Sequence, residues 1–63
     1  MKNRIKILRE EKNMTQNELA EKSGLSLRTI QRIEAGNILK GFTLKTIAQT
    51  LQTDPENLFD KAE

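Results

Sequence analysis

The chain has 63 residues, enough for one small domain whose hydrophobic core supplies only a few kcal/mol of net stability. It contains no Cys and no His, which excludes disulfide frameworks, thiolate chemistry and the usual structural zinc sites. Its net charge is +2, and no apolar run is long enough to span a membrane. We therefore expect a single cytoplasmic domain over residues 1–63, with no metal, no cofactor and no membrane segment.

Apolar side chains recur three and four residues apart, which predicts helices along the whole chain and no strand. The first helix is expected over residues 2–12, where Ile5 and Leu8 share one face. Asn13 follows it, and asparagine tolerates the left-handed backbone conformation that closes a helix. The first helix should therefore end at this residue.

The second helix has clear start and stop signals. Thr15 and Glu18 are three residues apart and form a capping box, so the helix is expected to start at about Gln16. It should stop at Gly24, because glycine adopts a positive φ without steric cost just past a helix end.

The third helix follows after a very short connection. Ser26 is its expected cap, and the helix should run from about residue 27 to residue 35 before Gly36 terminates it. A connection of about three residues makes two helices cross at a steep angle, and the small Ala20 allows their close approach.

A loop over residues 36–41 should lead to the fourth helix. Thr43 is its expected cap, with Phe42 and Ile47 packing across it as a hydrophobic staple. Gln52 follows this helix and would be strained if it took the left-handed conformation there.

The fifth helix is expected to be short. Asp54 should cap it, and Pro55 should occupy its first position, where the missing N–H matters least. The predicted core takes apolar residues from all five helices: Ile5, Leu8, Leu19, Ala20, Leu25, Ile30, Ile33, Leu44, Ile47, Leu51, Leu58 and Phe59.

Two arginines lie on the outward side of the third helix. Ile30 and Ile33 should point inward, which places Arg28 and Arg32, one turn apart, on the opposite face. The major groove of duplex DNA admits one α-helix, and arginine pairs with guanine in bidentate fashion. A pair of exposed arginines is, however, also ordinary on a surface helix, and the basic residues 1–12 beside the acidic residues 54–63 fit either explanation.

The whole pattern resembles the phage-repressor and Cro-like helix-turn-helix family, also called the XRE family, from Arg4 to Phe59. The residues that carry the resemblance are Gln16, Glu18, Leu19, Ala20, Gly24, Leu25, Ser26, Ile30, Ile33, Glu34, Gly36, Leu44, Ile47, Ala48 and Leu51, followed by the ending DPENLF. The resemblance implies an all-α, compact five-helix, lambda-repressor-like domain whose second and third helices form the helix-turn-helix. It also implies sequence-specific binding of double-stranded DNA for transcriptional regulation, as a repressor.

The resemblance also implies roles for single residues. Base contacts are expected from the start of the third helix: Leu27, Arg28, Thr29 and Arg32. Contacts to the DNA backbone are expected from Gln16, Ser26, Gln31, Asn37 and Lys40. Arg9 and Glu34 match positions that form a structural ion pair in related repressors, so we expect them to stabilise the fold.

Repressors of this type bind as symmetric dimers to two half-sites, so a homodimer on a partly palindromic operator is expected. Ile38 and Leu39, together with Leu58 or Phe59, are candidates for its interface, although Leu58 and Phe59 are also candidates for the monomer core. The sequence leaves open whether the free domain is a monomer that pairs only on DNA.

Two other functions stay open. The chain could be the antitoxin of a toxin-antitoxin pair, or a protein-interaction module that uses its basic first helix. An enzyme is not expected, because the chain lacks His, Cys and Tyr and its carboxylates fall at caps and on solvent-facing helical positions.

Overall fold

The fold was analysed in a computed structural model, which describes residues 3–37 and 41–59. These residues form four α-helices and one 3-10 helix: α1 (Ile5–Glu11), α2 (Gln16–Ser23), α3 (Leu27–Glu34), α4 (Gly41–Thr50) and η1 (Pro55–Leu58). The expected all-α class is therefore confirmed, but the expected count of five helices is not, because the described residues form four α-helices and a 3-10 turn. The last element has only four residues, and its Asn57 N–H bonds back three residues to the Asp54 carbonyl at 2.9 Å, as in a 3-10 turn.

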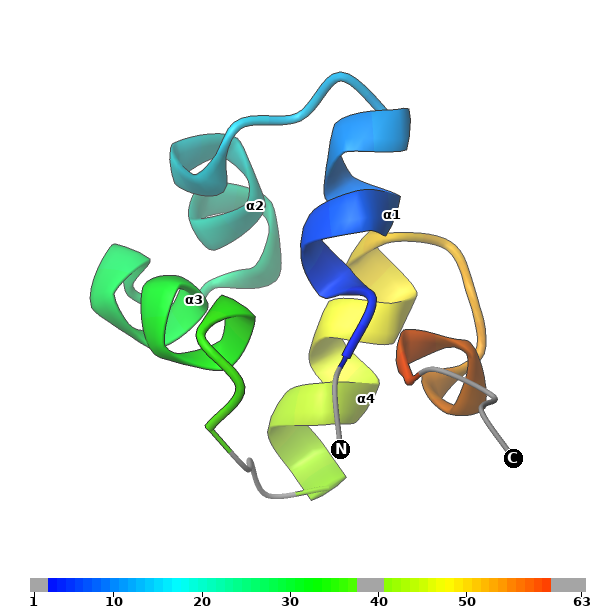
Figure 1. The fold of residues 1–63 in the computed structure, drawn as a ribbon. Coiled ribbons are helices and arrows are strands. Elements are labelled where there is room, and N and C mark those ends of the chain that lie inside the picture. Colours follow the sequence, from blue (N-terminus) through cyan, green and yellow to red (C-terminus); the bar gives the residue numbers. More distant parts are fainter. Residues whose placement is uncertain (1–2, 38–40, 60–63) are drawn as a thin grey trace.

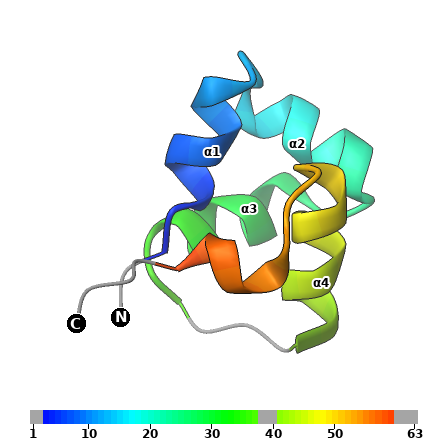
Figure 2. The same ribbon diagram turned by 90° about the vertical axis from the view of Figure 1, so that its right-hand side faces the viewer.

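The helices enclose one core, with the α2–α3 pair on one side of the molecule (Figure 1). The packed pairs are α2 with α3, α2 with α4, α4 with η1 and α1 with α3. The view turned by 90° shows η1 lying beside α4 (Figure 2). The two ends of the described chain are tied together, because Asn3 and Phe59 form an antiparallel bridge and the Arg4 N–H donates to the Leu58 carbonyl at 2.6 Å. The first helix consequently begins at Ile5, later than the sequence predicted.

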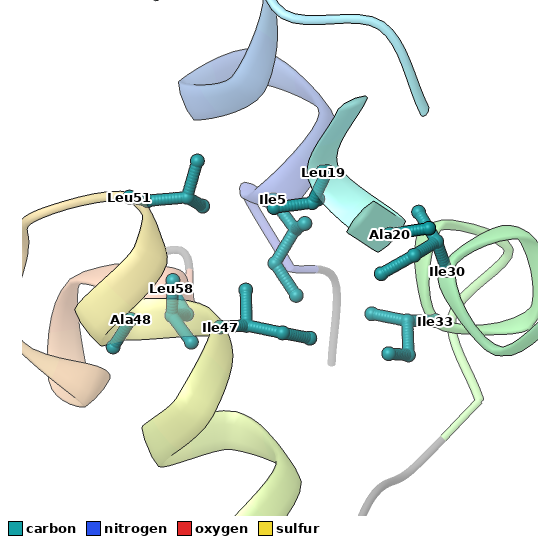
Figure 3. Close-up of a cluster of buried hydrophobic side chains, with 9 residues drawn as sticks. All are labelled: Ile5, Leu19, Ala20, Ile30, Ile33, Ile47, Ala48, Leu51 and Leu58. Carbon is teal, nitrogen blue, oxygen red and sulfur yellow. The ribbon is translucent and has the colours of Figure 1, made fainter. Parts of the chain in front are cut away.

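Among the described residues, the core consists of nine side chains that are at most 5% exposed (Figure 3): Ile5, Leu19, Ala20, Ile30, Ile33, Ile47, Ala48, Leu51 and Leu58. Four other predicted core residues, Leu8, Leu25, Leu44 and Phe59, are partly buried against this cluster. Ala48 was absent from the predicted core, because a side chain as small as that of alanine is only a weak indication that the position is buried. Full burial of Leu58 places it in the monomer core and removes it from the expected dimer interface.

The start of the fourth helix differs from its prediction. Gly41 is already helical, so Thr43 lies inside α4 and does not cap it. Phe42 is 79% exposed and therefore does not form the expected staple with the buried Ile47. The spacing of Phe42 and Ile47 was misleading, because the same spacing also occurs by chance in a helix that starts three residues earlier than expected.

Two residues other than glycine close helices in the left-handed conformation. Asn13 follows α1 with φ 56°, as predicted, and Gln52 follows α4 with φ 57°. At the second position the Thr53 N–H donates to the Ala48 carbonyl at 2.9 Å, which is the long hydrogen bond of a Schellman motif. Gln52 thus carries the strain that the sequence indicated, since only glycine adopts this φ freely.

Candidate nucleic-acid interface

The turn between α2 and α3 depends on the backbone of Gly24, which has φ 77°. A Cβ atom at this position would meet nothing within 4 Å, so the glycine is required for its conformation and not for space. Ser23 tightens the turn: its hydroxyl donates to the Ala20 carbonyl at 3.3 Å and accepts the Leu25 N–H at 3.4 Å. These contacts hold α3 at a fixed angle to α2.

Both helices begin at polar caps that the sequence predicted. The Thr15 hydroxyl accepts the Glu18 N–H at 3.0 Å, and the Glu18 carboxylate accepts the Thr15 N–H at 2.8 Å, so the capping box of α2 is complete. These hydrogen bonds hold the pKa of Glu18 below its ordinary value. At α3 the Ser26 hydroxyl accepts the Thr29 N–H at 3.1 Å and donates to the Thr29 hydroxyl at 2.9 Å. The first turn of α3 is therefore fixed by its own side chains.

The two faces of α3 differ sharply in exposure. Ile30 and Ile33 are at most 1% exposed, whereas Arg28, Gln31 and Arg32 are exposed. Leu27, at the start of the helix, is 37% exposed. Within the described residues, neither arginine side chain of α3 has a hydrogen-bond or ion-pair partner, so this face offers two guanidinium groups to a ligand.

Beneath the helix-turn-helix lies an ion pair between α1 and α3. The Arg9 Nε donates to Glu34 Oε2 at 2.7 Å and its Nη2 to Oε1 at 3.2 Å, in bidentate geometry. The Nη1 atom of Arg9 also donates to the Met14 carbonyl at 2.7 Å, and Gln16 Nε2 donates to Glu34 Oε1 at 3.0 Å. The two charged side chains are only 9% and 6% exposed, so the ion pair, with Gln16 of α2 bonded to it, joins three helices from within the protein.

This network determines the ionisation of Glu34. Burial alone would raise the pKa of its carboxyl, but hydrogen bonds from Arg9 and Gln16, with the positive charges of Arg9 and Lys6, outweigh burial and lower that pKa. The hydrogen bond with Glu34 in turn raises the pKa of Arg9, against the effect of burial. Both groups are therefore charged at neutral pH.

A shallow groove of about 620 Å³ runs between α1, the start of α2 and α3. It is lined by Lys6 and Arg9 of α1, by Gln16 and Asn17 of α2, and by Leu27 and Gln31 of α3. The structure thus brings Gln16, Leu27 and Gln31 together, although they come from two helices. Sequence reasoning did not select Lys6 or Asn17, because only the packing of α1 against α3 places them beside this groove.

The C-terminal end of α3 is held by two asparagines. The side-chain amide of Asn37 donates to the Arg32 carbonyl at 2.9 Å, and that of Asn3 donates to the Ile33 carbonyl at 2.7 Å. The amide expected to contact the DNA backbone thus caps the helix. The contact of Asn3 spans 30 residues and has no signal in the sequence. Lys40, Ile38 and Leu39 lie outside the described residues.

Among the described residues, none of the helices is both long and apolar enough to cross a membrane. The same residues contain no group of three or more His, Cys, Asp or Glu side chains that could hold a metal ion.

Comparison with known proteins agrees with this geometry. The family described as Helix-turn-helix matches residues 5–58. The HTH-type transcriptional repressor RghR of Bacillus subtilis (strain 168) is 42% identical over 60 residues, which cover 92% of this chain and 44% of that protein. The chain therefore spans less than half the length of this relative. No solved structure matches the chain.

Proposed function

This chain belongs to the helix-turn-helix family of transcription regulators, whose members bind double-stranded DNA at specific sequences, and we propose that α3 is the helix that reads its operator. The observation that carries the proposal is the division of α3 into two faces. Its apolar residues, Ile30 and Ile33, are buried, while Arg28 and Arg32 project outward. A helix of about 10–12 Å in diameter fits a major groove about 12 Å wide.

The outward side chains at the start of α3 make the base contacts. Arg28 and Arg32 each pair with a guanine through its O6 and N7 atoms. Leu27 is apolar and half-exposed, which suits contact with a thymine methyl group. Thr29 contacts a base edge or a phosphate, because its hydroxyl accepts the hydrogen bond from Ser26 and its own O–H stays free to donate.

The DNA backbone is contacted around this helix by Gln16, Ser26, Gln31, Asn37 and Lys40. These contacts set the register of the protein on the duplex and make affinity depend on salt, without choosing the sequence. The side-chain amide of Gln16 donates to Glu34, so its contact uses the remaining amide hydrogen or the backbone N–H. Both the amide and the backbone N–H of Asn37 donate to the Arg32 carbonyl, so its contact uses the remaining amide hydrogen.

The domain binds a partly palindromic operator as a homodimer. One α3 has eight residues and is about 12 Å long at about 1.5 Å per residue, so one copy reads only a few base pairs. Two copies bound about 34 Å apart double the number of bases read. The expected stoichiometry is two chains per full site and one per half-site.

Repression is the proposed outcome of binding, and the name of the Bacillus subtilis relative supports it. The protein-interaction alternative depends on a basic first helix. In the structure Arg9 is buried and Arg4 is half-buried, and the exposed Lys6 and Lys12 are matched by the exposed Glu10 and Glu11. This balance weighs against α1 as a docking site for an acidic partner. No observation favours the antitoxin reading.

The test is selection from a randomised duplex DNA library with the parent protein and an Arg28→Ala, Arg32→Ala double variant. The parent should enrich a partly palindromic site, and the variant should lose that enrichment while its thermal melt stays unchanged. A control variant, Lys12→Ala with Lys45→Ala, removes the same charge from the end of α1, at its C-cap, and from α4, and should enrich the same site. Absence of any enriched sequence with the parent would contradict the proposed function.

A further inference from the structure

The side chain of Asn3 holds the C-terminal end of α3 from a distant part of the chain. Its Nδ2 atom donates to the Ile33 carbonyl at 2.7 Å, and its Oδ1 atom accepts the Ile5 N–H at 3.1 Å. The second bond forms an Asx turn that leads into α1. One half-buried amide group therefore joins the start of α1 to the end of α3.

The backbone of Asn3 is fixed by the other end of the described chain. Asn3 and Phe59 form an antiparallel bridge, and the next residue, Arg4, donates its N–H to the Leu58 carbonyl. Leu58 is fully buried and belongs to the core. The contact with α3 thus comes from a backbone that is held by η1, independently of the turn between α2 and α3.

The contact lies at the end of α3 that is opposite to this turn. The Ile33 carbonyl is one of the last four of the helix, which lack an α-helical partner. It accepts the Gly36 N–H at 2.9 Å as well as the amide of Asn3. Arg32 is the residue directly before Ile33, and its side chain is on the exposed side of the helix. The amide of Asn3 therefore bonds the backbone next to an arginine that is proposed to read a base.

We propose that Asn3 is a positioning residue for base recognition, because its amide holds the last turn of α3 where Arg32 meets a guanine in bidentate geometry. The inference rests on the proposed function, since Arg32 meets a base only if α3 lies in the major groove. A bidentate pair requires the guanidinium group to be held within about 0.5 Å and 10–20° of its productive position. Asn3 acts through the backbone of α3 and makes no base contact of its own.

The test compares the parent with Asn3→Ser on the operator selected from the library and on a scrambled duplex of equal length. Serine has one polar side-chain atom, which can accept the Ile5 N–H, but it lacks the second arm of the amide that reaches α3. Affinity for the operator should fall by about 3–10-fold, less than the loss of a whole bidentate contact. Affinity for the scrambled duplex should be unchanged, because it depends on charge and the substitution is neutral.

A double-mutant cycle with Arg32→Ala separates positioning from a general effect on folding. If Asn3 acts through Arg32, the Asn3→Ser substitution should cause no further loss of operator affinity in a chain that already carries Arg32→Ala. In a chain with Arg28→Ala it should still cause most of its loss, since the amide bonds the turn of α3 that contains Arg32. A role in stability alone would give the same loss in both backgrounds.

The matched control is Asn57→Ser. Asn57 is also half-buried, and its side-chain amide donates to the Thr53 hydroxyl at 3.1 Å, but it belongs to η1 and not to the contacts of α3. This variant should keep the parental ratio of operator to scrambled affinity.

Three results would overturn the inference and leave the proposed function standing. They are a parental affinity ratio in Asn3→Ser, an equal fall of the ratio in the two serine variants, and an equal loss on both duplexes, which unfolding would also produce. If the parent does not prefer the operator to the scrambled duplex, the proposed function itself fails, and the inference fails with it.

Discussion

The inward and outward sides of α3 are formed by the same eight residues but are held by different interactions. On the inward side, Ile30 and Ile33 enter the core and Glu34 is bonded to Arg9 and Gln16. On the outward side, the guanidinium groups of Arg28 and Arg32 have no hydrogen-bond or ion-pair partner among the described residues. The difference teaches that stability and DNA recognition occupy separate faces of one helix, so substitutions should separate them.

The largest effect is expected from Glu34→Ala, on the inward side. The substitution leaves the buried guanidinium of Arg9 without its carboxylate, which should lower the free energy of unfolding by about 3–5 kcal/mol. For a domain of this size such a loss removes most of the folded population. Urea unfolding followed by circular dichroism checks it, with Glu21→Ala on the exposed side of α2 as the control. A Glu34→Ala midpoint equal to that of the parent would refute a stabilising role.

The outward side should respond in the opposite way. Arg28→Ala and Arg32→Ala should each weaken binding to the selected operator by about 1–3 kcal/mol, because each removes a bidentate base contact. The free energy of unfolding should change by no more than about 0.5 kcal/mol, since both side chains are exposed. Binding titrations and urea melts on the same samples check both halves. A large loss of stability in either variant would mean that the two faces are not separate.

A third prediction concerns the residues outside α3 that close helices in the left-handed conformation. Gln52→Gly should raise the free energy of unfolding by about 1 kcal/mol, because it relieves the left-handed conformation at φ 57°. Asn13→Gly should gain less, since asparagine tolerates this conformation better. Operator affinity should be unchanged in both. A lower melting temperature for Gln52→Gly would show that the Gln52 side chain makes a contribution larger than the strain.

The smallest effect is expected in the pH dependence of stability, through the carboxyl group of Glu34. The folded pKa of Glu34 lies below its unfolded value, so between the two the unfolded chain binds more protons and stability rises with pH. The contribution of Glu34 is complete above the unfolded value of about 4.3 and is lost as the pH falls through the folded pKa. Urea midpoints of the parent and Glu34→Gln should therefore converge as the pH falls below the unfolded value and through the lower folded pKa. A constant difference across the series would contradict the assigned direction.

Local features of the fold were predictable because their causes are local. The capping box at Thr15, the glycine turn at Gly24 and the cap at Ser26 each depend on residues within one turn of helix. The helical spacing of Ile30 and Ile33 also predicted which side of α3 is buried. The division of α3 into a buried and an exposed face could therefore be predicted from the sequence.

The remaining features depend on contacts between distant parts of the chain. The amide of Gln16 binds Glu34, 18 residues away, and Asn3 binds the Ile33 carbonyl, 30 residues away. Neither partner follows from local spacing, and the position of Lys6 beside the groove follows only from the packing of α1. The start of α4 at Gly41 and the 3-10 form of η1 were missed because staples and proline caps indicate a helix start without fixing its exact residue or its type.

The central claim, that outward arginines of α3 read bases, is tested most directly with one set of titrations. Parent and Arg32→Ala are measured against the selected operator and against every single-base variant of one half-site. The account predicts that the parent discriminates at each read position, and that Arg32→Ala loses discrimination at one position while keeping it at the others. Equal weakening on all the duplexes would show that Arg32 contacts only the backbone, which would contradict the claim.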